Sequence, residues 1–303
     1  MPAFRLAHLS DPHLPPPPLP LAGLRPKQML SLLAWRRKKR RRHTPEVLAA
    51  ITADIAAAAP DHIAVTGDLT NFASPAEYAA AAAWLESLGD PAEVTVSPGN
   101  HDALTGRSDH ARFHPWRRWL GDAEDVLFPA LRRRGPLAIF NLCSAVPTAL
   151  HRAQGRIGAD QAARLEAGLR EASAAGLFRV VLLHHPVTRG VVSRRVELVD
   201  QAALRRTLQQ AGAELVLHGH AHAATLAALA GPAGPIPVLG VPSASAEPGH
   251  GEAARWHMIE IDPAAALLRV TARGIGPGRS VAEIGRYDLA APCPGPPQGP
   301  RQG

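Results

Sequence analysis

The chain has 303 residues, 46% of them hydrophobic, which is enough to bury a sizeable core in one or two domains. Its formal net charge of +7 equals the charge of one basic run, so the rest of the chain is neutral: Arg36, Arg37, Lys38, Lys39, Arg40, Arg41 and Arg42. This excludes a nucleic-acid groove spread over the whole surface, and an aromatic content of 4% excludes a platform for stacking single strands.

The N-terminal residues MPAFRLAHLSDPHL contain neither the apolar core nor the cleavage site of a signal peptide. No apolar run approaches the roughly 20 residues that span a bilayer. The two cysteines, Cys143 and Cys293, are expected to be free thiols in a reducing compartment. These features predict a soluble, cytoplasmic protein.

Short runs rich in Val, Ile and Leu predict nine buried strands. In chain order they are residues 4–9, 62–66, 93–97, 137–142, 179–183, 214–217, 236–241, 256–261 and 267–273. Helix starts are marked by Thr44-Pro45, with Pro in the first turn, and by the capping box from Ser74 to Glu77. The predicted helices cover residues 44–59, 74–88, 159–175 and 200–211.

The first half of the chain therefore reads βαβαβ, and the second half is richer in consecutive strands. This order predicts an α/β (α+β) fold in which two sheets pack face to face with helices outside. We expect one domain over residues 1–289, with an insertion at about residues 15–43 that begins with a proline run and ends in the basic run. The Pro/Gly-rich residues 290–303 are predicted to be a disordered tail.

Residues able to bind a metal follow five of the predicted strands. In chain order they are Asp11 and His13, then Asp68, then Asn100, His101 and Asp102, then His184, and finally His220 and His222. The carboxyl ends of the strands of an α/β fold share one rim, so we expect these side chains to gather there. Residues i and i+2 of an extended segment point to the same side. Asp11 and His13 could therefore reach one ion together, and so could His220 and His222. Pro12 favours an extended Asp11.

The donor atoms in this set are imidazole, carboxylate and amide, without thiolate. Such sites suit Mn²⁺, Fe or Zn²⁺. Without His101 and Asp102 the set has seven candidate ligands, which is more than one tetrahedral ion can use, and two divalent or trivalent ions sharing a carboxylate would use all seven. Two ions about 3.5–4 Å apart are the arrangement that supports in-line phosphoryl displacement. Gly67, Gly99 and Gly219 would let the chain turn off each strand near the ions.

Five motifs in this order resemble the calcineurin-like metallophosphoesterase superfamily over roughly residues 4–275: Asp11-x-His13, Gly67-Asp68-x-x-Asn71, Gly99-Asn100-His101-Asp102, His184-His185-Pro186 and Gly219-His220-x-His222. The sequence is most similar to the branch of cyclic-nucleotide phosphodiesterases and glycerophosphodiesterases. The resemblance implies a four-layer double β-sandwich flanked by helices. Pro12 departs from the commonest first motif but removes no ligand.

The resemblance also implies roles. Asp11, His13 and His222 would hold the first metal, Asp68 would bridge, and Asn100, His184 and His220 would complete the second. Asn100 and His101 would face the substrate. His101 would act as proton donor or charge stabiliser, oriented by a hydrogen bond to Asp102. The implied reaction is hydrolysis of a small phosphoester by a hydroxide that bridges the metals.

Other functions are kept as alternatives. A phosphomonoesterase or a nuclease of the same superfamily would use the same site. A non-catalytic metal-binding scaffold that docks on anionic surfaces is a third interpretation, although no ligand of the motif set is missing.

The basic run is expected to assist the chemistry rather than perform it. It continues a helical pattern in which Leu30, Leu33 and Trp35 are predicted to turn inward. The run is either a solvated helix end or a contact to an anionic membrane surface, at the inner face of the membrane, or to nucleic acid.

Further histidines were assigned structural roles. His185 and His218 lie next to ligands but are expected to pack, as is His8. The stretch with His110, His114, Trp116 and Trp119 is predicted to be a surface helix with a buried tryptophan face, or alternatively a wall of the substrate cleft.

Overall fold

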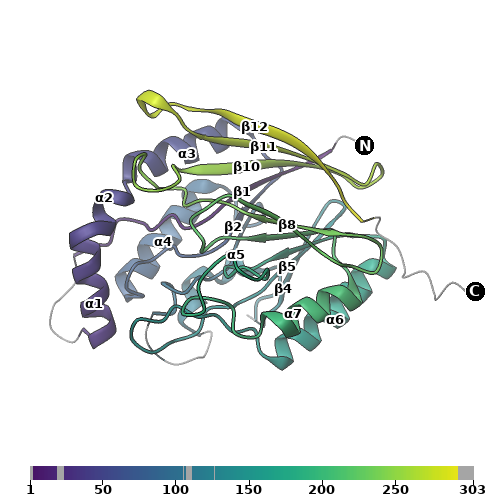
Figure 1. Cartoon of the computed structure of the whole chain (residues 1–303), viewed down its shortest axis with the longest axis horizontal. Coiled ribbons are helices and arrows are strands. Elements are labelled where there is room, and N and C mark those ends of the chain that lie inside the picture. The colour runs from purple at the N-terminus through teal and green to yellow at the C-terminus, as the bar shows by residue number, and fades with distance from the viewer. Residues whose placement is uncertain (1–2, 19–23, 105, 107–110, 126, 293–303) are drawn as a thin grey trace, which may run out of the picture.

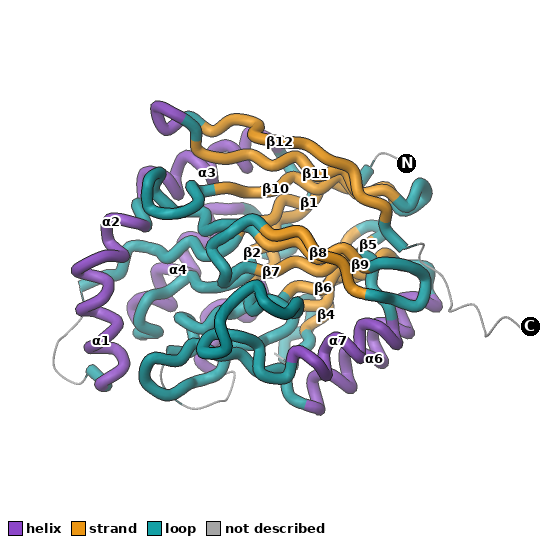
Figure 2. The backbone as a smooth tube through the Cα atoms, viewed as in Figure 1, coloured by secondary structure: helices purple, strands orange, loops and turns teal. Residues whose placement is uncertain are grey.

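The computed structural model describes residues 3–18, 24–104, 106, 111–125 and 127–292. Two six-stranded sheets pack face to face between layers of helices (Figures 1 and 2). The first sheet has the strand order β12-β11-β10-β1-β2-β3. Its strands are β1 (Phe4–Leu9), β2 (His62–Val65), β3 (Val94–Val96), β10 (Arg255–Asp262), β11 (Leu267–Ile275) and β12 (Val281–Ala290).

The second sheet has the order β4-β5-β6-β7-β9-β8. Its strands are β4 (Ala130–Arg134), β5 (Leu137–Asn141), β6 (Phe178–Leu182), β7 (Leu215–His218), β8 (Thr225–Leu229) and β9 (Ile236–Gly240). Strands β1, β2 and β3 are parallel to one another, as are β5, β6, β7 and β9. The carboxyl ends of these parallel strands therefore lie at a common edge of each sheet.

Helices cover the outer face of each sheet. Helices α3 (Pro45–Ala58) and α4 (Pro75–Leu88) pack on the first sheet, and α6 (Ala159–Ala174) and α7 (Gln201–Ala211) pack on the second (Figure 1). Alternate residues of a strand face opposite layers: on β6, Val180 faces the other sheet and Val181 faces the helices. The fold is the predicted double sandwich of four layers.

All nine predicted strands are present, with ends within two residues of the prediction, and the four predicted helices are present as well. Strands β4, β8 and β12 were missed. Each is the edge strand of its sheet. Edge strands bury only part of their side chains, as the largely exposed β12 shows, so they lack the continuous apolar run that marks a central strand.

A helical segment inserted between β1 and β2 lies beside the rim. It contains α1 (Pro26–Ala34), a π-helical turn η1 (Trp35–Lys39) and α2 (Arg40–Arg42) (Figure 1). The prediction that Leu30 and Leu33 turn inward is wrong, because both are exposed, at 42% and 44%.

The inward face of this segment is a stripe of residues at helical spacing. Gln28 and Ser31 donate hydrogen bonds to the carbonyl oxygens of Phe72 and Asn71, and Leu32 is buried. The Trp35 ring meets the Phe72 ring edge to face. Because of these hydrogen bonds, α1 turns a different face inward from the one that its leucine residues predict.

The C-terminal end differs from the predicted boundary by a short distance. Ala290 is the last residue of β12, and Ala291 is buried. The remainder of the predicted tail, from residue 293 onward, lies outside the described residues, as does Cys293. The division into one domain with an insertion stays a prediction.

Candidate metal centre

Seven predicted ligands come together at the rim, although they come from five separate loops. Two of the loops follow β1 and β2, a third follows β3, and the others follow β6 and β7. Ser10 pairs with Ser243 in an isolated bridge between the end of β1 and the loop after β9, which joins the two sheets next to the site. The residues gathered are Asp11, His13, Asp68, Asn100, His184, His220 and His222.

One group of ligand atoms surrounds Asp11. Nε2 of His222 lies 3.1 Å from Oδ1 of Asp11 and 3.4 Å from Nε2 of His13. Nε2 of His13 lies 3.9 Å from Oδ2 of Asp68. One ligand atom each of Asp11, His13 and Asp68 falls within 4.8 Å of the others. These separations suit atoms that surround one ion.

A second group surrounds the other oxygen of Asp68. Nε2 of His184 lies 3.5 Å from Oδ1 of Asp68, 3.1 Å from Oδ1 of Asn100 and 3.2 Å from Nδ1 of His220. One ligand atom each of Asp68, His184 and His220 falls within 4.8 Å of the others. Asp68 thus stands between the two groups, with one carboxylate oxygen toward each.

Hydrogen bonds outside the cluster orient the imidazoles. Nδ1 of His184 lies 2.6 Å from the carbonyl oxygen of Thr66, so it carries the proton and Nε2 faces the cluster. Nε2 of His220 lies 2.7 Å from the carbonyl oxygen of Val196, which turns Nδ1 toward the cluster. Such partners are typical of histidines that bind metals.

The electrostatics of the cluster favour anionic carboxylates. Burial would raise the pKa of Asp11, but His222 lowers it to about 2. Burial would raise the pKa of Asp68 too, and His184 and His101 hold it well below its usual value. Burial would lower the pKa of His184, and the Asp68 carboxylate raises it to about 9. Opposite charges are therefore concentrated within a few ångströms of one another.

The backbone at the ligands is strained. Asp11, His13, Asp68, His220 and His222 all have positive φ, between 41° and 66°. Residues other than glycine rarely adopt this region, and such strain collects at functional sites. The expectation that Asp11 and His220 begin extended segments is therefore wrong. The paired ligands do converge, but a left-handed turn brings them together.

Two glycines leave room for the cluster. Gly67 has φ of 96°, and a Cβ there would lie 2.6 Å from Nδ1 of His184. A Cβ on Gly99 would collide with the Asp68 carboxylate. Any side chain at these positions would displace a predicted ligand.

His101 and Asp102 both hydrogen-bond to the loop that carries Asp68. The Asp102 carboxylate accepts hydrogen bonds from the backbone amides of Asp68, Thr70 and Gly99, at 2.9, 2.8 and 2.8 Å. Nδ1 of His101 lies 3.0 Å from the carbonyl oxygen of Asn71, and its amide donates to Asp68. Asp102 therefore ties the loops that carry the ligands together, and a direct hydrogen bond between His101 and Asp102 stays a prediction. Burial and the charge of Asp68 raise the pKa of Asp102 to about 7.

The donor set fits a pair of metal ions. It combines buried carboxylates with imidazoles, of which His184 and His220 have their outer nitrogen already hydrogen-bonded, and it contains no thiolate. Nitrogen and oxygen donors of this kind suit Mn²⁺, Fe or Zn²⁺. Asp11, His13, Asp68 and His222 would hold one ion, and Asp68, Asn100, His184 and His220 the other.

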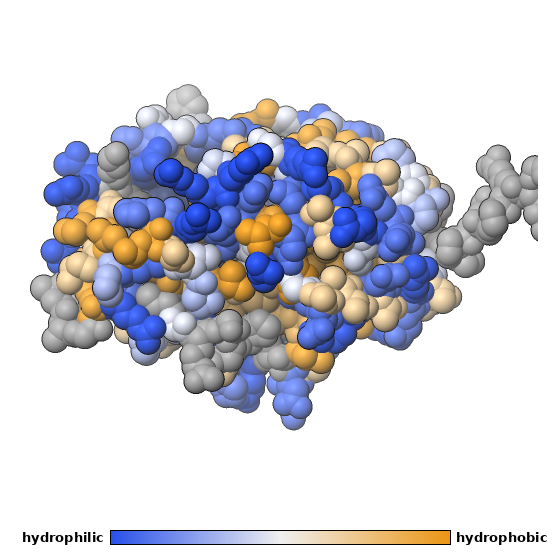
Figure 3. All heavy atoms as spheres, turned by 60° about the horizontal axis from the view of Figure 1, so that its bottom comes forward, coloured by the Kyte–Doolittle hydropathy of each residue, from blue (hydrophilic) through white to orange (hydrophobic). Residues whose placement is uncertain are grey.

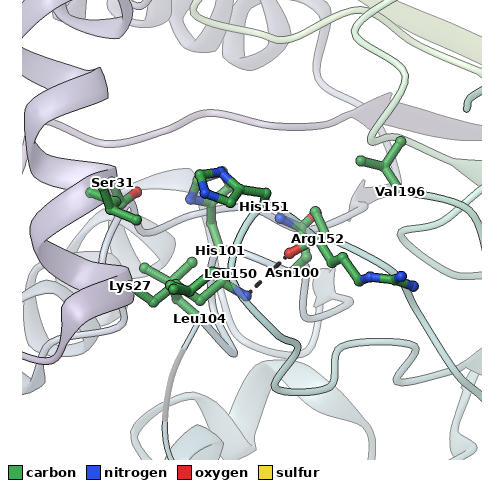
Figure 4. Close-up of a pocket in the computed structure, with 11 residues that line it drawn as sticks. Lys27, Ser31, Asn100, His101, Leu104, Leu150, His151, Arg152 and Val196 are labelled. Carbon is green, nitrogen blue, oxygen red and sulfur yellow. Dashed lines mark hydrogen bonds between the residues drawn. The ribbon is translucent and has the colours of Figure 1, made fainter.

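Two pockets open beside the cluster. One, of about 240 Å³, is lined by Asn100 and His101 together with Lys27, Leu30 and Arg152 (Figure 4). The other, of about 450 Å³, lies on the side of His220 and His222. The inserted helical segment contributes to both pockets, which the sequence did not indicate.

Lys27 is one residue that the sequence analysis missed. Its Nζ donates to the hydroxyl oxygen of Thr148 at 2.6 Å. It also donates to the carbonyl oxygen of Arg152 at 3.2 Å (Figure 4). Burial lowers its pKa. A lysine near a proline-rich run carries no sequence signal for this role, because its partners lie more than a hundred residues later.

A second missed residue is His43, which lines the larger pocket. It is the last letter of the basic stretch and immediately precedes the Thr44-Pro45 helix start. A histidine immediately before a predicted helix start could have been noticed in the sequence. Its hydrogen-bond partners Ser243 and Ser245, however, are distant in sequence.

The histidines expected to pack are buried. His8, His185 and His218 are fully buried. Both ring nitrogens of His185 are engaged, with the Ser144 hydroxyl at 2.7 Å and the Ala153 carbonyl oxygen at 3.1 Å.

The predicted tryptophan face is confirmed. Trp116 closes the 3₁₀ turn η2 (Ala111–Trp116), Trp119 lies in α5 (Arg117–Leu120), and both are buried, while His114 is exposed. His110 lies outside the described residues.

The model of the calcineurin-like phosphoesterase family matches residues 4–224, and the chain belongs to this family.

Three curated relatives match part of the chain. A cAMP/cGMP dual specificity phosphodiesterase from Mycobacterium tuberculosis is 33% identical over 178 residues, which are 57% of this chain and 52% of that protein. A "Probable cyclic nucleotide phosphodiesterase" from Synechococcus is 30% identical over 71% of this chain and 77% of its own length. One from Rhodococcus erythropolis is 32% identical over 61% and 58%. The match therefore spans little more than half of the first and third relatives.

Solved structures share the fold at low identity. A dimetal phosphatase from Danio rerio has a TM-score of 0.55 at 12% identity and covers 94% of this chain and 99% of its own. A purple acid phosphatase from yellow lupin seeds has a TM-score of 0.55 at 11% identity and covers 95% and 54%.

Proposed function

We propose that the protein is a dinuclear metal phosphodiesterase acting on a small cyclic nucleotide or a glycerophosphodiester-like substrate. The position of Asp68 carries the proposal, since its two oxygens face His13 and His184 in separate ligand groups, at 3.9 and 3.5 Å. The cyclic-nucleotide activity named for relatives about 30% identical supports this substrate class.

The chain's own residues perform distinct tasks in this proposal. When bound, the two ions would neutralise charge on the phosphate oxygens and make water a stronger nucleophile. His101, held by the Asn71 carbonyl oxygen at the mouth of the smaller pocket, donates a proton to the leaving oxygen or stabilises its charge. Lys27, in the same pocket, attracts the anionic substrate.

The test compares two model substrates. Metal-stripped protein is repleted with Mn²⁺ and assayed on bis(p-nitrophenyl) phosphate and p-nitrophenyl phosphate, beside Asn100→Ala and a control, His114→Ala, which removes an exposed imidazole outside the site. Faster diester hydrolysis that is lost in Asn100→Ala supports the proposal. Faster monoester hydrolysis would move the function to a phosphomonoesterase.

Two further outcomes separate the remaining alternatives. Cleavage of DNA at low salt would favour a nuclease. Absence of turnover, together with stoichiometric metal, would favour a non-catalytic scaffold. The same assay with cyclic AMP and a glycerophosphodiester then divides the two proposed substrate groups.

We also propose that the inserted helical segment contacts an anionic membrane surface from the cytoplasmic side. Five of its arginines are exposed: Arg36, Arg37, Arg40, Arg41 and Arg42. Met29, Leu30 and Leu33 are exposed beside them on α1, and Figure 3 shows apolar side chains gathered on the side of the molecule where α1 lies. The exposed apolar residues favour lipid over nucleic acid. No described helix is long and apolar enough to cross a membrane.

A further inference from the structure

His43 lies against the first ligand group although it belongs to none of the metallophosphoesterase motifs. Its ring centroid is 4.5 Å from that of His13 and 5.4 Å from that of His222. One nitrogen of each of these three histidines falls within 4.8 Å of the others. Three imidazoles from distant parts of the chain therefore meet at one point.

Two serine hydroxyls lie against one side of the His43 imidazole. The Ser243 hydroxyl donates its only proton to the carbonyl oxygen of Asp11, at 2.6 Å. Nδ1 of His43 lies 3.2 Å from this hydroxyl, which can accept its proton, and 3.0 Å from the Ser245 hydroxyl. In the tautomer with the proton on Nδ1, Nε2 of His43 carries the lone pair that a metal requires.

The backbone on both sides of His43 is fixed. His43 forms an antiparallel bridge with Ala246. The Thr44 amide donates to the Ser245 carbonyl oxygen at 3.0 Å, and the Glu247 amide donates to the Arg42 carbonyl oxygen at 2.8 Å. The Thr44 hydroxyl donates to Glu247 instead of capping α3. The imidazole is thus held in place before any ion binds.

His185 shows what a structural histidine looks like in the same region. It packs 4.4 Å from the His220 ring, as close to a predicted ligand as His43 is to His13. Its two nitrogens are nevertheless both committed, to Ser144 and Ala153. The His43 imidazole, by contrast, places one nitrogen within 4.8 Å of ligand nitrogens of His13 and His222.

We propose that His43 is an additional ligand of the ion held by Asp11, His13, Asp68 and His222. This inference rests on the metal centre proposed above. It gives that ion three imidazoles, which favours metals that prefer nitrogen donors, such as Zn²⁺ and Fe, over Mn²⁺. It also couples the inserted segment to the metal centre, because His43 directly follows the basic run.

The test is His43→Asn, because the asparagine amide can still donate to Ser243 in place of Nδ1 but does not reach the position of Nε2. Metal-free wild type and variant are titrated with Zn²⁺ and Co²⁺ against a competing chelator. Stoichiometry is measured, and the visible spectrum of bound Co²⁺ reports the ligands. We expect a loss of affinity for one ion of about 10–100-fold or more, a changed Co²⁺ spectrum and unchanged affinity for the other ion.

Controls separate the possible failures. His114→Asn should bind both ions as wild type does, and His43→Glu, whose longer side chain brings a carboxylate to the position of Nε2, should recover part of the affinity. Equal affinities and identical Co²⁺ spectra in His43→Asn and wild type would overturn the inference while leaving the proposed function intact. A wild type that binds no metal would overturn both. Matching circular dichroism and melting temperature of the metal-free proteins establishes that the variants fold, and if His43→Asn does not fold, His43→Ala, which also removes Nε2, takes its place in the titration.

Discussion

Nε2 of His13 and Nε2 of His222 lie 3.4 Å apart, although 209 positions separate the two residues. The Asp11 carboxylate lies 3.1 Å from one of these nitrogens. A bound cation would stabilise this cluster of donor atoms more than bound water would. Because a metal binds the folded centre and not the unfolded chain, metal binding should raise the free energy of unfolding.

The first prediction therefore concerns thermal stability. At a free Mn²⁺ or Zn²⁺ concentration 100 times the dissociation constant, the gain is about 2.7 kcal/mol, which corresponds to a rise in melting temperature of about 5–10 °C. Differential scanning fluorimetry with and without a chelator measures it. The rise should shrink in His222→Ala and persist in His114→Ala. Equal melting temperatures of metal-free and repleted wild type would contradict the metal centre.

A second prediction concerns His101, whose backbone amide donates to Oδ1 of Asp68 at 2.7 Å. His101→Asn should lower kcat by about 100- to 10,000-fold, because it removes the proton donor. Metal stoichiometry should stay at the wild-type value, since the backbone amide remains. A variant that loses metal together with activity would show instead that His101 acts as a structural support of the centre.

A third prediction concerns Asp102. Its carboxylate accepts hydrogen bonds from three backbone amides in the loops that follow β2 and β3. Asp102→Asn has only one acceptor oxygen, so at least one buried amide loses its partner at a cost of about 1–3 kcal/mol. Urea denaturation of the metal-free protein measures this loss. Tyr78→Phe, which removes a bond to the Asp102 carbonyl oxygen and leaves its carboxylate untouched, is the matched control. An unaltered unfolding midpoint in Asp102→Asn would reject this role.

The fold was largely predictable from sequence because the central strands are buried on both faces. Strands such as β6 read as continuous Val and Leu, and their ends are marked by the residues of the site. The seven candidate ligands could be found because they follow strands in order. The edge strand β12 could not be predicted from sequence, since most of its side chains are exposed.

The remaining errors have a common cause, which is that long-range polar contacts override local pattern. The inward face of α1 is set by Gln28 and Ser31 bonding to the loop of Phe72 and Asn71, not by its leucines. His43 is placed by serines about 200 positions away. Left-handed φ values at Asp11 and His13 replaced the expected extended geometry, and nothing in the local sequence signals such strain.

A fourth prediction concerns the exposed arginines of the inserted segment. Replacing Arg36, Arg37, Arg40 and Arg41 with glutamine should weaken binding to vesicles containing phosphatidylserine by about 1 kcal/mol per residue, and added salt should weaken wild-type binding. Co-sedimentation measures both effects. The matched control neutralises four exposed arginines elsewhere: Arg117, Arg118, Arg206 and Arg286. Equal loss in both variants would indicate general charge attraction, and preferential binding of DNA over vesicles would favour nucleic acid.

The last prediction concerns acid stability and His62, a buried residue of β2 outside the metal centre. Burial and the charges of Arg132 and Arg134 lower its pKa to about 3, while its Nε2 lies 2.8 Å from the Thr95 hydroxyl. The unfolded histidine has a pKa of about 6.5, so the unfolded state binds a proton that the folded state does not. The contribution to stability is therefore complete above about pH 6.5 and is lost as the pH falls toward the folded pKa, by about 1.4 kcal/mol per pH unit.

His62→Gln tests this directly, because the glutamine amide can keep the bond to Thr95 but does not titrate. Urea midpoints of the metal-free proteins between pH 7 and pH 4 should fall less steeply in the variant than in wild type. All other titrating groups are shared by the two proteins, so the difference in slope reports His62 alone. His114→Gln, which removes an exposed histidine, should follow the wild-type slope. Parallel slopes for His62→Gln and wild type would mean that the buried imidazole accepts its proton in the folded state.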